Sequence, residues 1–370
     1  MQNKLKIAIL GTRGIPNQYG GFEQFAEYLS VGLAEKDHKV TVYNPHFHEF
    51  QEAAYRGVEV VYKYSPEDKL GASANFIYDY LCLRDALNKD FDIILECGYQ
   101  SVAVSYFITP IQKSILVTNM DGMEWKRSKW SNFVKKITKK FEEWGAKKSH
   151  ALVSDNKGIS EYLQNEYGVV SAMIPYGAEI FNEPNLEVLL EYEVRDCNYF
   201  LLIARLEPEN NIEMILDGYV ESDSETTFLV IGNHSTPYGE SLKKKYHQSG
   251  IKFLGGIYDQ NKINNLRYYS KAYFHGHSVG GTNPSLLEAM ACNCFIIAHD
   301  NEFNKSVLKE NALFFGNAIK VKEYIKNIDE FNDSKEEFKN NNIEQVKSTY
   351  SWDTIVDQYE RLFKELVANQ

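Results

Sequence analysis

Short apolar runs alternate with helix-like segments along most of the chain, and this alternation restricts the possible folds more than any other feature. Between the runs, apolar residues recur every three or four positions, the spacing of one helix face. Strands that alternate with helices form a parallel sheet with helices on both faces, the doubly wound α/β fold. The predicted strands comprise residues 4–10, 39–43, 58–62, 92–96, 114–118, 151–154, 171–174, 199–204, 227–232, 252–254, 272–274 and 295–298.

The alternation is interrupted at Pro175-Tyr176-Gly177, and Asn182-Glu183-Pro184 follows. After this interruption the strand and helix pattern starts again. A chain of 370 residues is long enough for about two or three domains. We therefore predict two doubly wound halves of similar size, with the boundary between residues 176 and 177. An amphipathic helix from residue 352 ends the chain.

Composition argues against several classes of function. The net charge of −11 disfavours general binding to nucleic acids. Residues 1–10 lack the apolar core of a signal peptide, and no apolar run approaches the length of a membrane span, so we expect a cytoplasmic protein. The five cysteines are scattered, which indicates reduced thiols. Neither Cys292 with Cys294 nor the histidine pairs at 46/48 and 275/277 have a third ligand nearby, so we expect no metal.

A glycine-rich loop follows the first predicted strand. It extends from Gly11 to Gly21 and precedes a helix with an apolar face. It is not a P-loop, since no Gly-Lys-Ser/Thr follows, and it lacks the G-x-G-x-x-G pattern. Gly20 and Gly21 would allow the backbone to approach a bound group closely. The alternative is a flexible loop that binds no ligand.

Carboxylates follow two other strands of the first half. Glu96 ends one predicted strand, and Asp121 and Glu124 follow the next. In open parallel sheets, ligands bind beyond the carboxyl ends of the strands. These positions therefore suit Asp121 and Glu124 for chemistry. The alternative for each is a loop carboxylate that caps a helix.

In the second half, residues 276–293 join a strand to a helix through a glycine pair. Asn283 or Thr282 is a suitable N-cap, and Pro284 is well placed at the first helical position. The first N–H groups of such a helix have no intrahelical partner and lie at the positive end of its dipole, so the turn is a candidate phosphate site. Glu288 lies one turn further on and would reach hydroxyls. The alternative is an ordinary strand-to-helix turn.

Arg205 ends the first strand of the second half, within the segment 204–211. We expect it at the same edge of the sheet as the turn before Glu288. A guanidinium there can hold phosphate oxygens with two donors at once. The alternative is a surface salt bridge with Glu207 or Glu209.

Residues 125–148 carry nine basic residues and two acidic ones, a net charge of +7 within a chain of −11. Phe133, Ile137, Phe141 and Trp144 recur there at helical spacing. A basic amphipathic helix with aromatic residues favours an anionic membrane surface. The alternative is a solvated lysine face over an apolar stripe that belongs to the core.

Together these motifs resemble the retaining glycosyltransferases of family 4, which have the GT-B fold. The features that carry the resemblance are the two doubly wound halves, the Gly-Gly loop, the segment Arg205-Leu206-Glu207-Pro208-Glu209 and the helix beginning Asn283-Pro284-Ser285-Leu286. The loops at 11–23 and 204–211 are most similar to a bacterial branch that includes rhamnosyltransferases of capsule and cell-wall polysaccharide assembly. The resemblance implies two Rossmann-like domains facing across a cleft, with residues 352–370 crossing back to the N-terminal domain of residues 1–176. Residues 177–351 would bind the nucleotide sugar.

The resemblance also implies roles for single residues. Gly20 and Gly21 would line the cleft near the diphosphate, and Arg205 would bind it. Glu288 would accept a hydrogen bond from a ribose hydroxyl, and Asp121 would lie near the reacting sugar. The start of the last motif, Asn283, Pro284, Ser285 and Leu286, would present the helix N-terminus to the donor.

Two positions depart from the wider family. Asn210 replaces a usual lysine, which removes a cation from the diphosphate, and Gly280 replaces a usual glutamate that holds donor-sugar hydroxyls. The expected reaction moves a sugar, L-rhamnose from dTDP-rhamnose as first candidate, to a hydroxyl of a lipid-linked saccharide at the inner membrane face. It needs no cofactor beyond the nucleotide-sugar donor. A sugar-nucleotide epimerase and a non-catalytic partner of the same fold remain alternatives.

Overall fold

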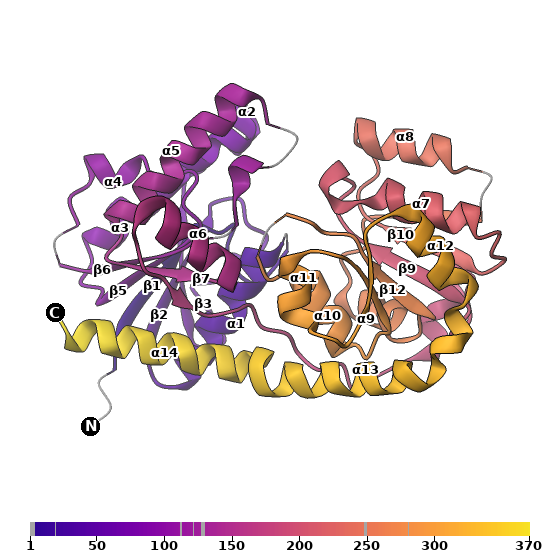
Figure 1. Cartoon of the computed structure of the whole chain (residues 1–370). Coiled ribbons are helices and arrows are strands. Elements are labelled where there is room, and N and C mark those ends of the chain that lie inside the picture. Colours follow the sequence, from indigo (N-terminus) through magenta and orange to yellow (C-terminus); the bar gives the residue numbers. More distant parts are fainter. Residues whose placement is uncertain are drawn as a thin grey trace. The chain divides into compact units, whose positions relative to one another are not determined.

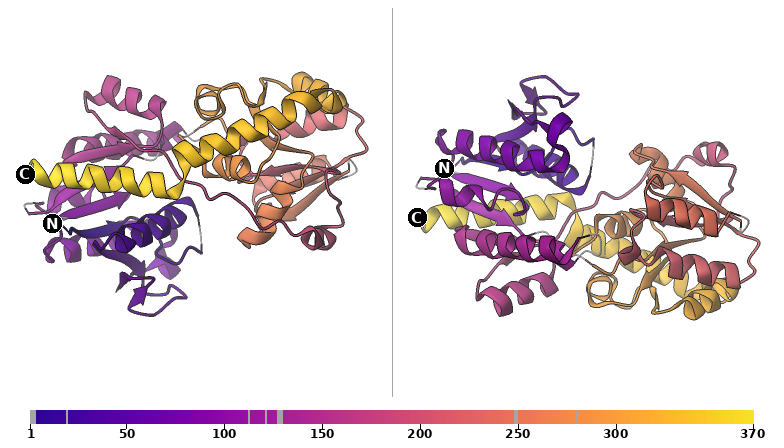
Figure 2. Two further views of the ribbon diagram at one scale, coloured as in Figure 1. Left: turned by 90° about the horizontal axis from the view of Figure 1, so that it is seen from below. Right: turned by 90° about the horizontal axis from the view of Figure 1, so that it is seen from above.

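The computed structural model describes residues 4–18, 20–111, 113–120, 122–126, 130–247, 250–279 and 281–370. The chain divides into two compact units: unit 1 comprises Met1–Tyr176 with Trp352–Gln370, and unit 2 comprises Gly177–Ser351. Each unit is a central sheet with helices on both faces (Figure 1, Figure 2). The predicted α/β class with two Rossmann-like sheets is therefore confirmed.

Unit 1 contains an eight-stranded sheet in the order β3-β4-β2-β1-β5-β6-β7-β8. All neighbouring strands are parallel except the short edge strand β3, which pairs antiparallel with β4. Strands β1, β5 and β6 are covered on both faces, which explains their almost uninterrupted apolar sequences. The strands are β1 (Lys6–Leu10), β2 (Lys39–Pro45), β3 (Ala54–Tyr55), β4 (Val58–Lys63), β5 (Ile93–Cys97), β6 (Ile115–Asn119), β7 (Ala151–Ser154) and β8 (Ala172–Met173).

The helices of unit 1 include one from the far end of the chain. They are α1 (Gly21–Glu35), α2 (Glu67–Leu70), α3 (Ala74–Leu87), α4 (Ser105–Ile108), α5 (Asn132–Lys148), α6 (Lys157–Tyr167) and the C-terminal α14 (Trp352–Ala368). In the described part of the chain, no helix combines the length and the apolar composition needed to cross a bilayer.

Helix α14 packs against α1 and contributes to the core of unit 1. Its buried face consists of Trp352, Ile355, Val356, Tyr359 and Phe363. Gly32 on α1 permits the approach, because a Cβ atom there would lie 2.7 Å from Cγ2 of Val356. The rings of Tyr28 and Trp352 stack with centroids 4.6 Å apart. The amphipathic pattern of the tail therefore reflects burial within unit 1.

Polar contacts also hold α14 in place. The Glu360 carboxylate lies 3.3 Å from Nζ of Lys36 and 3.1 Å from Nε2 of His38, and Lys364 contacts it at 2.5 Å. Burial alone would raise the pKa of Glu360, but the hydrogen bonds from Lys364, His38 and Lys36 outweigh it and lower the pKa to about 2. The carboxylate is therefore ionised over the ordinary pH range.

Unit 2 contains a six-stranded, fully parallel sheet in the order β11-β10-β9-β12-β13-β14. This is the 3-2-1-4-5-6 order of the Rossmann fold, with its switch point between β9 and β12. The strands are β9 (Tyr199–Ile203), β10 (Thr227–Ile231), β11 (Ile251–Gly255), β12 (Ala272–His275), β13 (Ile296–His299) and β14 (Leu313–Phe315). The helices are α7 (Ile212–Glu221), α8 (Pro237–Lys245), α9 (Gln260–Tyr268), α10 (Pro284–Ala291), α11 (Glu302–Leu308), α12 (Ala318–Lys326) and α13 (Asn332–Gln345).

Candidate active site

The loops that follow β9 and β12 contact each other at the switch point of unit 2. Nδ2 of Asn211 donates to the Gly276 carbonyl at 2.8 Å, and Oγ of Ser278 donates to the Glu209 carbonyl at 2.7 Å. A Cβ atom on Gly276 would lie 2.0 Å from the carbonyl oxygen of Asn210, so this close approach requires glycine. The loop after β9, which contains Arg205, and the loop after β12, which leads to Ser285, are thus joined at one edge of the unit 2 sheet.

Arg205 is exposed at the start of the β9–α7 loop. Its carbonyl accepts from the backbone N–H of Glu207 and from Nδ2 of Asn210, both at 2.8 Å. Within the described residues, no carboxylate lies within salt-bridge distance of the Arg205 guanidinium, so the alternative pairing with Glu207 or Glu209 is not formed. Asn210 is buried and braces the loop through its side chain. The guanidinium is therefore available to an anion.

Helix α10 begins as its sequence predicts, with Asn283 as N-cap and Pro284 at the first position. Oδ1 of Asn283 accepts from the N–H of Ser285 at 2.9 Å, and the Asn283 carbonyl accepts from Leu286 at 3.0 Å. These N–H groups, which the sequence assigns to a diphosphate, are satisfied by the cap itself. An anion at this end would thus interact with the helix dipole, or would displace the Asn283 side chain.

Glu288 is held by Arg267, a residue that the sequence interpretation missed. Arg267 is buried on α9, and its Nη2 lies 2.6 Å from Oε2 of Glu288 and 3.1 Å from Oγ of Ser285. Oγ of Ser285 also lies 2.8 Å from the hydroxyl of Tyr273. Burial would lower the pKa of Arg267, but the charge of Glu288 raises it above its ordinary value. The pair thus fixes the position of the Glu288 carboxylate on α10.

Two histidines lie beside this edge. The rings of His275 and His277 stack with centroids 4.4 Å apart, and the His277 carbonyl accepts from Nδ2 of Asn301 and of Asn304, each at 3.0 Å. His275 is fully buried, and burial holds the pKa of its ring well below the ordinary value. His275 is thus a neutral core residue. The two asparagines, which no sequence pattern identified, fix the loop after β12 from the β13–α11 side.

In unit 1 the glycine-rich loop is firmly held. Asn44 exchanges two hydrogen bonds with the backbone of Ile15, at 3.0 and 2.8 Å, and the N–H of Arg13 donates to Oε1 of Glu23 at 2.8 Å. Gly20 precedes α1 as its N-cap residue, and Gly21 begins the helix. These contacts fix the backbone at Arg13 and Ile15, and ligand binding at Gly20 and Gly21 stays a prediction. Asp121 lies outside the described residues.

A buried carboxyl pair lies below this loop. Glu96, the last residue but one of β5, has no exposed surface, and within the described residues neither of its carboxylate oxygens has a hydrogen-bond partner. A Cβ atom on Gly11 would lie 3.1 Å from its Oε2. Burial raises the pKa of Glu96 well above its ordinary value, and it raises the pKa of nearby Asp79 to about 7. Glu96 is thus a neutral acid at the switch point of unit 1.

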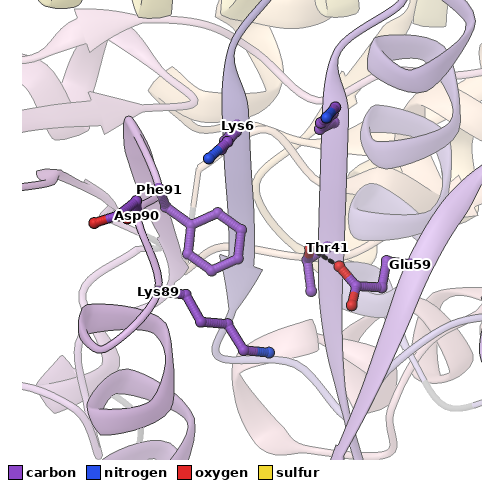
Figure 3. A pocket seen from close by; sticks show the side chains of 7 residues that line it. Lys6, Thr41, Glu59, Lys89, Asp90 and Phe91 are labelled. Carbon is purple, nitrogen blue, oxygen red and sulfur yellow. Dashed lines mark hydrogen bonds between the residues drawn. The ribbon is translucent and has the colours of Figure 1, made fainter.

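One cavity lies at the opposite edge of the unit 1 sheet. Lys6 and Lys39 begin β1 and β2 there, and Figure 3 shows their side chains with Thr41, Glu59, Lys89, Asp90 and Phe91. The hydroxyl of Thr41 donates to Oε2 of Glu59 at 2.8 Å. Since ligands of doubly wound sheets bind at the carboxyl ends of the strands, this cavity at the amino ends is not the candidate active site.

Comparison with known proteins agrees with this architecture. Residues 4–179 match the family "Domain of unknown function (DUF1972)", and residues 192–349 match "Glycosyl transferases group 1". An uncharacterised glycosyltransferase of Methanocaldococcus jannaschii is 22% identical over an alignment of 402 residues that covers 98% of this chain and 99% of the relative.

Solved structures resemble the whole chain. The sucrose-phosphate synthase of Thermosynechococcus elongatus has a TM-score of 0.81 at 16% identity, covering 99% of this chain and all of that one. Anabaena HepE in complex with UDP-glucose has a TM-score of 0.75 at 13% identity, with coverage of 99% and 100%. The fold is therefore GT-B, and the match over residues 192–349, which is less than half of the chain, indicates a glycosyltransferase that uses a nucleotide sugar.

Proposed function

We propose that the chain is a retaining transferase that moves a sugar from a nucleoside diphosphate to a hydroxyl of a lipid-linked saccharide, in the synthesis of a cell-surface polysaccharide. The observation that carries the donor site is the joined edge of unit 2, where the exposed Arg205 and the start of α10 follow adjacent strands. The similarity of residues 11–23 and 204–211 to rhamnosyltransferases makes dTDP-rhamnose the first donor to test. UDP-glucose, bound by Anabaena HepE, is the second.

In the proposed reaction, the bond between C1 of the sugar and the diphosphate oxygen breaks, and a bond from C1 to the acceptor oxygen forms on the same face. The departing diphosphate takes the acceptor proton. Negative charge grows on the diphosphate as the sugar becomes oxocarbenium-like, so a cation already in position stabilises the transition state. Arg205 supplies that cation. Glu288, which Arg267 holds in place, accepts a hydrogen bond from a ribose hydroxyl.

Helix α5 (Asn132–Lys148) supports the proposed acceptor and the proposed location of the enzyme. A lipid-linked saccharide at the inner face of the membrane suits a chain whose residues 125–148 concentrate positive charge. We propose that this segment holds the enzyme at the anionic surface as a peripheral protein. Unit 1 would then bind the acceptor, with Gly20, Gly21 and Asp121 near the reacting groups.

A screen of nucleotide sugars for thermal stabilisation tests the donor assignment. A ligand that binds only the native form raises the melting temperature, so the true donor should raise it more than its free sugar does. Nucleotide release from that donor should then depend on acceptor. Release that needs no acceptor, or interconversion of the donor alone, would favour the epimerase alternative, and binding without turnover would favour the non-catalytic partner.

A further inference from the structure

Helix α5 contacts the core of unit 1 through a face that is not apolar. Its buried residues are Glu142, Gly145 and Ala146. The carboxylate of Glu142 accepts hydrogen bonds from the hydroxyls of Tyr99, Tyr162 and Tyr167 at 3.0, 2.5 and 2.7 Å. A Cβ atom on Gly145 would lie 2.8 Å from Cβ of Tyr99. Of the apolar stripe of α5, Phe133 and Ile137 are exposed, whereas Phe141 and Trp144 are partly buried.

The stripe instead extends onto two neighbouring helices. Phe141 and Trp144 are half-buried; the ring of Phe141 meets Phe76 of α3 with centroids 5.8 Å apart, and Trp144 meets Phe107 of α4 at 4.7 Å. Phe141 and Trp144 also contact each other at 5.6 Å. A continuous aromatic cluster thus joins α3, α4 and α5.

Large apolar side chains around this cluster are exposed to solvent. We call them the three-helix surface, and between 36% and 72% of each side chain is accessible: Phe76, Ile77, Phe107, Ile108, Phe133 and Ile137. Exposed Phe and Ile residues on three adjacent helices form a patch of the kind that marks an interaction site. Separated by tens of residues in the sequence, they are brought together only by the fold.

Lysines are interleaved with these apolar side chains. Lys136, Lys140, Lys147 and Lys148 are exposed on α5, and Nζ of Lys148 lies 4.9 Å above the ring of Phe107. Glu143 pairs with Lys140 at 2.7 Å and with Lys147 at 2.9 Å. The acidic residues are few, so residues 125–148 remain strongly positive. Apolar side chains beside cations match the boundary between acyl chains and anionic headgroups.

We propose that the three-helix surface inserts into the headgroup region of an anionic bilayer. Its Phe and Ile side chains reach the acyl boundary while the lysines contact lipid phosphates. The proposal rests on the membrane part of the proposed function and adds that binding depends on insertion as well as charge. A second copy of the same surface is a poor occupant, because a symmetric contact would oppose like charges.

Flotation with vesicles of phosphatidylcholine and phosphatidylglycerol tests the apolar part. The variant Phe107→Ser/Ile108→Ser/Phe133→Ser should bind such vesicles about tenfold more weakly, or worse, at any salt concentration. Val170→Ser is the matched control, because Val170 is 81% exposed in the same unit but lies outside the surface. Unchanged binding by the triple variant would overturn the proposal, even if salt still weakened the binding of the wild type.

The charged part has its own test. Lys136→Gln/Lys140→Gln/Lys148→Gln should lose preference for phosphatidylglycerol over pure phosphatidylcholine, with a smaller residual binding that salt no longer changes. Self-association of the wild type that the apolar triple variant abolishes, without vesicle binding by either, would assign the surface to a second copy and overturn the lipid proposal.

Lipid insertion has a spectroscopic readout that does not depend on catalysis. Brominated lipid should quench the fluorescence of Trp144, and Trp144→Phe, which keeps an aromatic ring in the cluster, should lose that component. Thermal stabilisation by nucleotide, measured on the same variants, should not change. A lack of nucleotide binding in every protein, wild type included, would refute the transferase proposal while leaving the surface supported by its vesicle results.

Discussion

The switch points of the two sheets occupy equivalent places and have opposite electrostatics. In unit 2 Arg267 of α9 forms a salt bridge with Glu288 of α10, and Arg205 is exposed on the β9–α7 loop. In unit 1 the equivalent edge covers Glu96, an acid that burial keeps neutral. Strand order alone therefore does not determine what binds. Unit 2 exposes a cation at this edge, whereas unit 1 covers an acid whose ionisation burial disfavours.

Breaking the pair in unit 2 should have the largest effect. Arg267→Met leaves Glu288 without its buried cation, and we expect a loss of about 3–5 kcal/mol in the free energy of unfolding, measured with urea. Lys262→Met, on the same helix but paired with the exposed Glu191, should change the free energy of unfolding far less. Adding Glu288→Gln to Arg267→Met should recover part of the loss. Equal costs for Arg267→Met and Lys262→Met would show that the pair is not a special feature of unit 2.

Removing the exposed cation should affect turnover more than stability. Arg205→Ala should lower kcat by about a hundredfold, since a fixed charge that stabilises a developing anion has about this value. The melting temperature should stay close to that of the wild type. Arg195→Ala, another exposed arginine of unit 2, is the control. A near wild-type rate for Arg205→Ala would remove the guanidinium from the proposed site.

The neutral acid of unit 1 predicts a pH dependence. The folded form holds a proton on Glu96 that the unfolded chain releases above about pH 4.5, so stability falls as the pH rises. Asp79, with a pKa of about 7, acts in the same direction. Glu96→Gln should make unfolding less sensitive to pH and add about 1–3 kcal/mol at pH 8. Glu221→Gln, on the surface of unit 2, is the control and should leave the pH dependence of unfolding unchanged. A steeper loss in Glu96→Gln than in the wild type would contradict a neutral Glu96.

The smallest effect concerns Glu360, an ionised carboxylate of unit 1 that contrasts with Glu96. Since the folded pKa of Glu360 is lowered to about 2, its contribution is present above about pH 4.5 and is lost as the pH falls toward 2. Glu360→Gln should reduce stability by about 1 kcal/mol at pH 6 and approach the wild type at pH 2. Glu365→Gln, exposed on the same helix, should match the wild type at both pH values, in unfolding followed by circular dichroism.

Much of the fold could be predicted because both sheets are buried on both faces. Strands such as β9 and β12 are apolar runs bounded by turn residues, and their order follows from the strand and helix alternation. Strand β14, a short strand at the edge of the sheet, was missed, and so was α13, because the apolar residues of α13 are too few to mark one face. Local pattern cannot identify elements that tertiary packing alone defines.

The candidate site was predictable only where chemistry and local structure coincide. The pair Asn283-Pro284 predicts the start of α10, and Arg205 comes shortly after the end of β9. Arg267 was hidden, because a single arginine on a predicted helix normally lies on its solvent face, and only the fold directs it to Glu288. The three-helix surface was hidden likewise, since Phe76 and Phe107 lie far from α5 in the sequence.

The place of α14 has a consequence for synthesis on the ribosome. Helix α1 emerges early, yet the side of it around Phe25 and Gly32 packs against α14, which is translated much later. The nascent N-terminal unit therefore exposes an apolar face of α1 until unit 2 has been translated and α14 has followed. A premature stop shortly before Trp352 would leave that face permanently bare, and such a product should be a substrate for chaperones and proteases even though both sheets are complete.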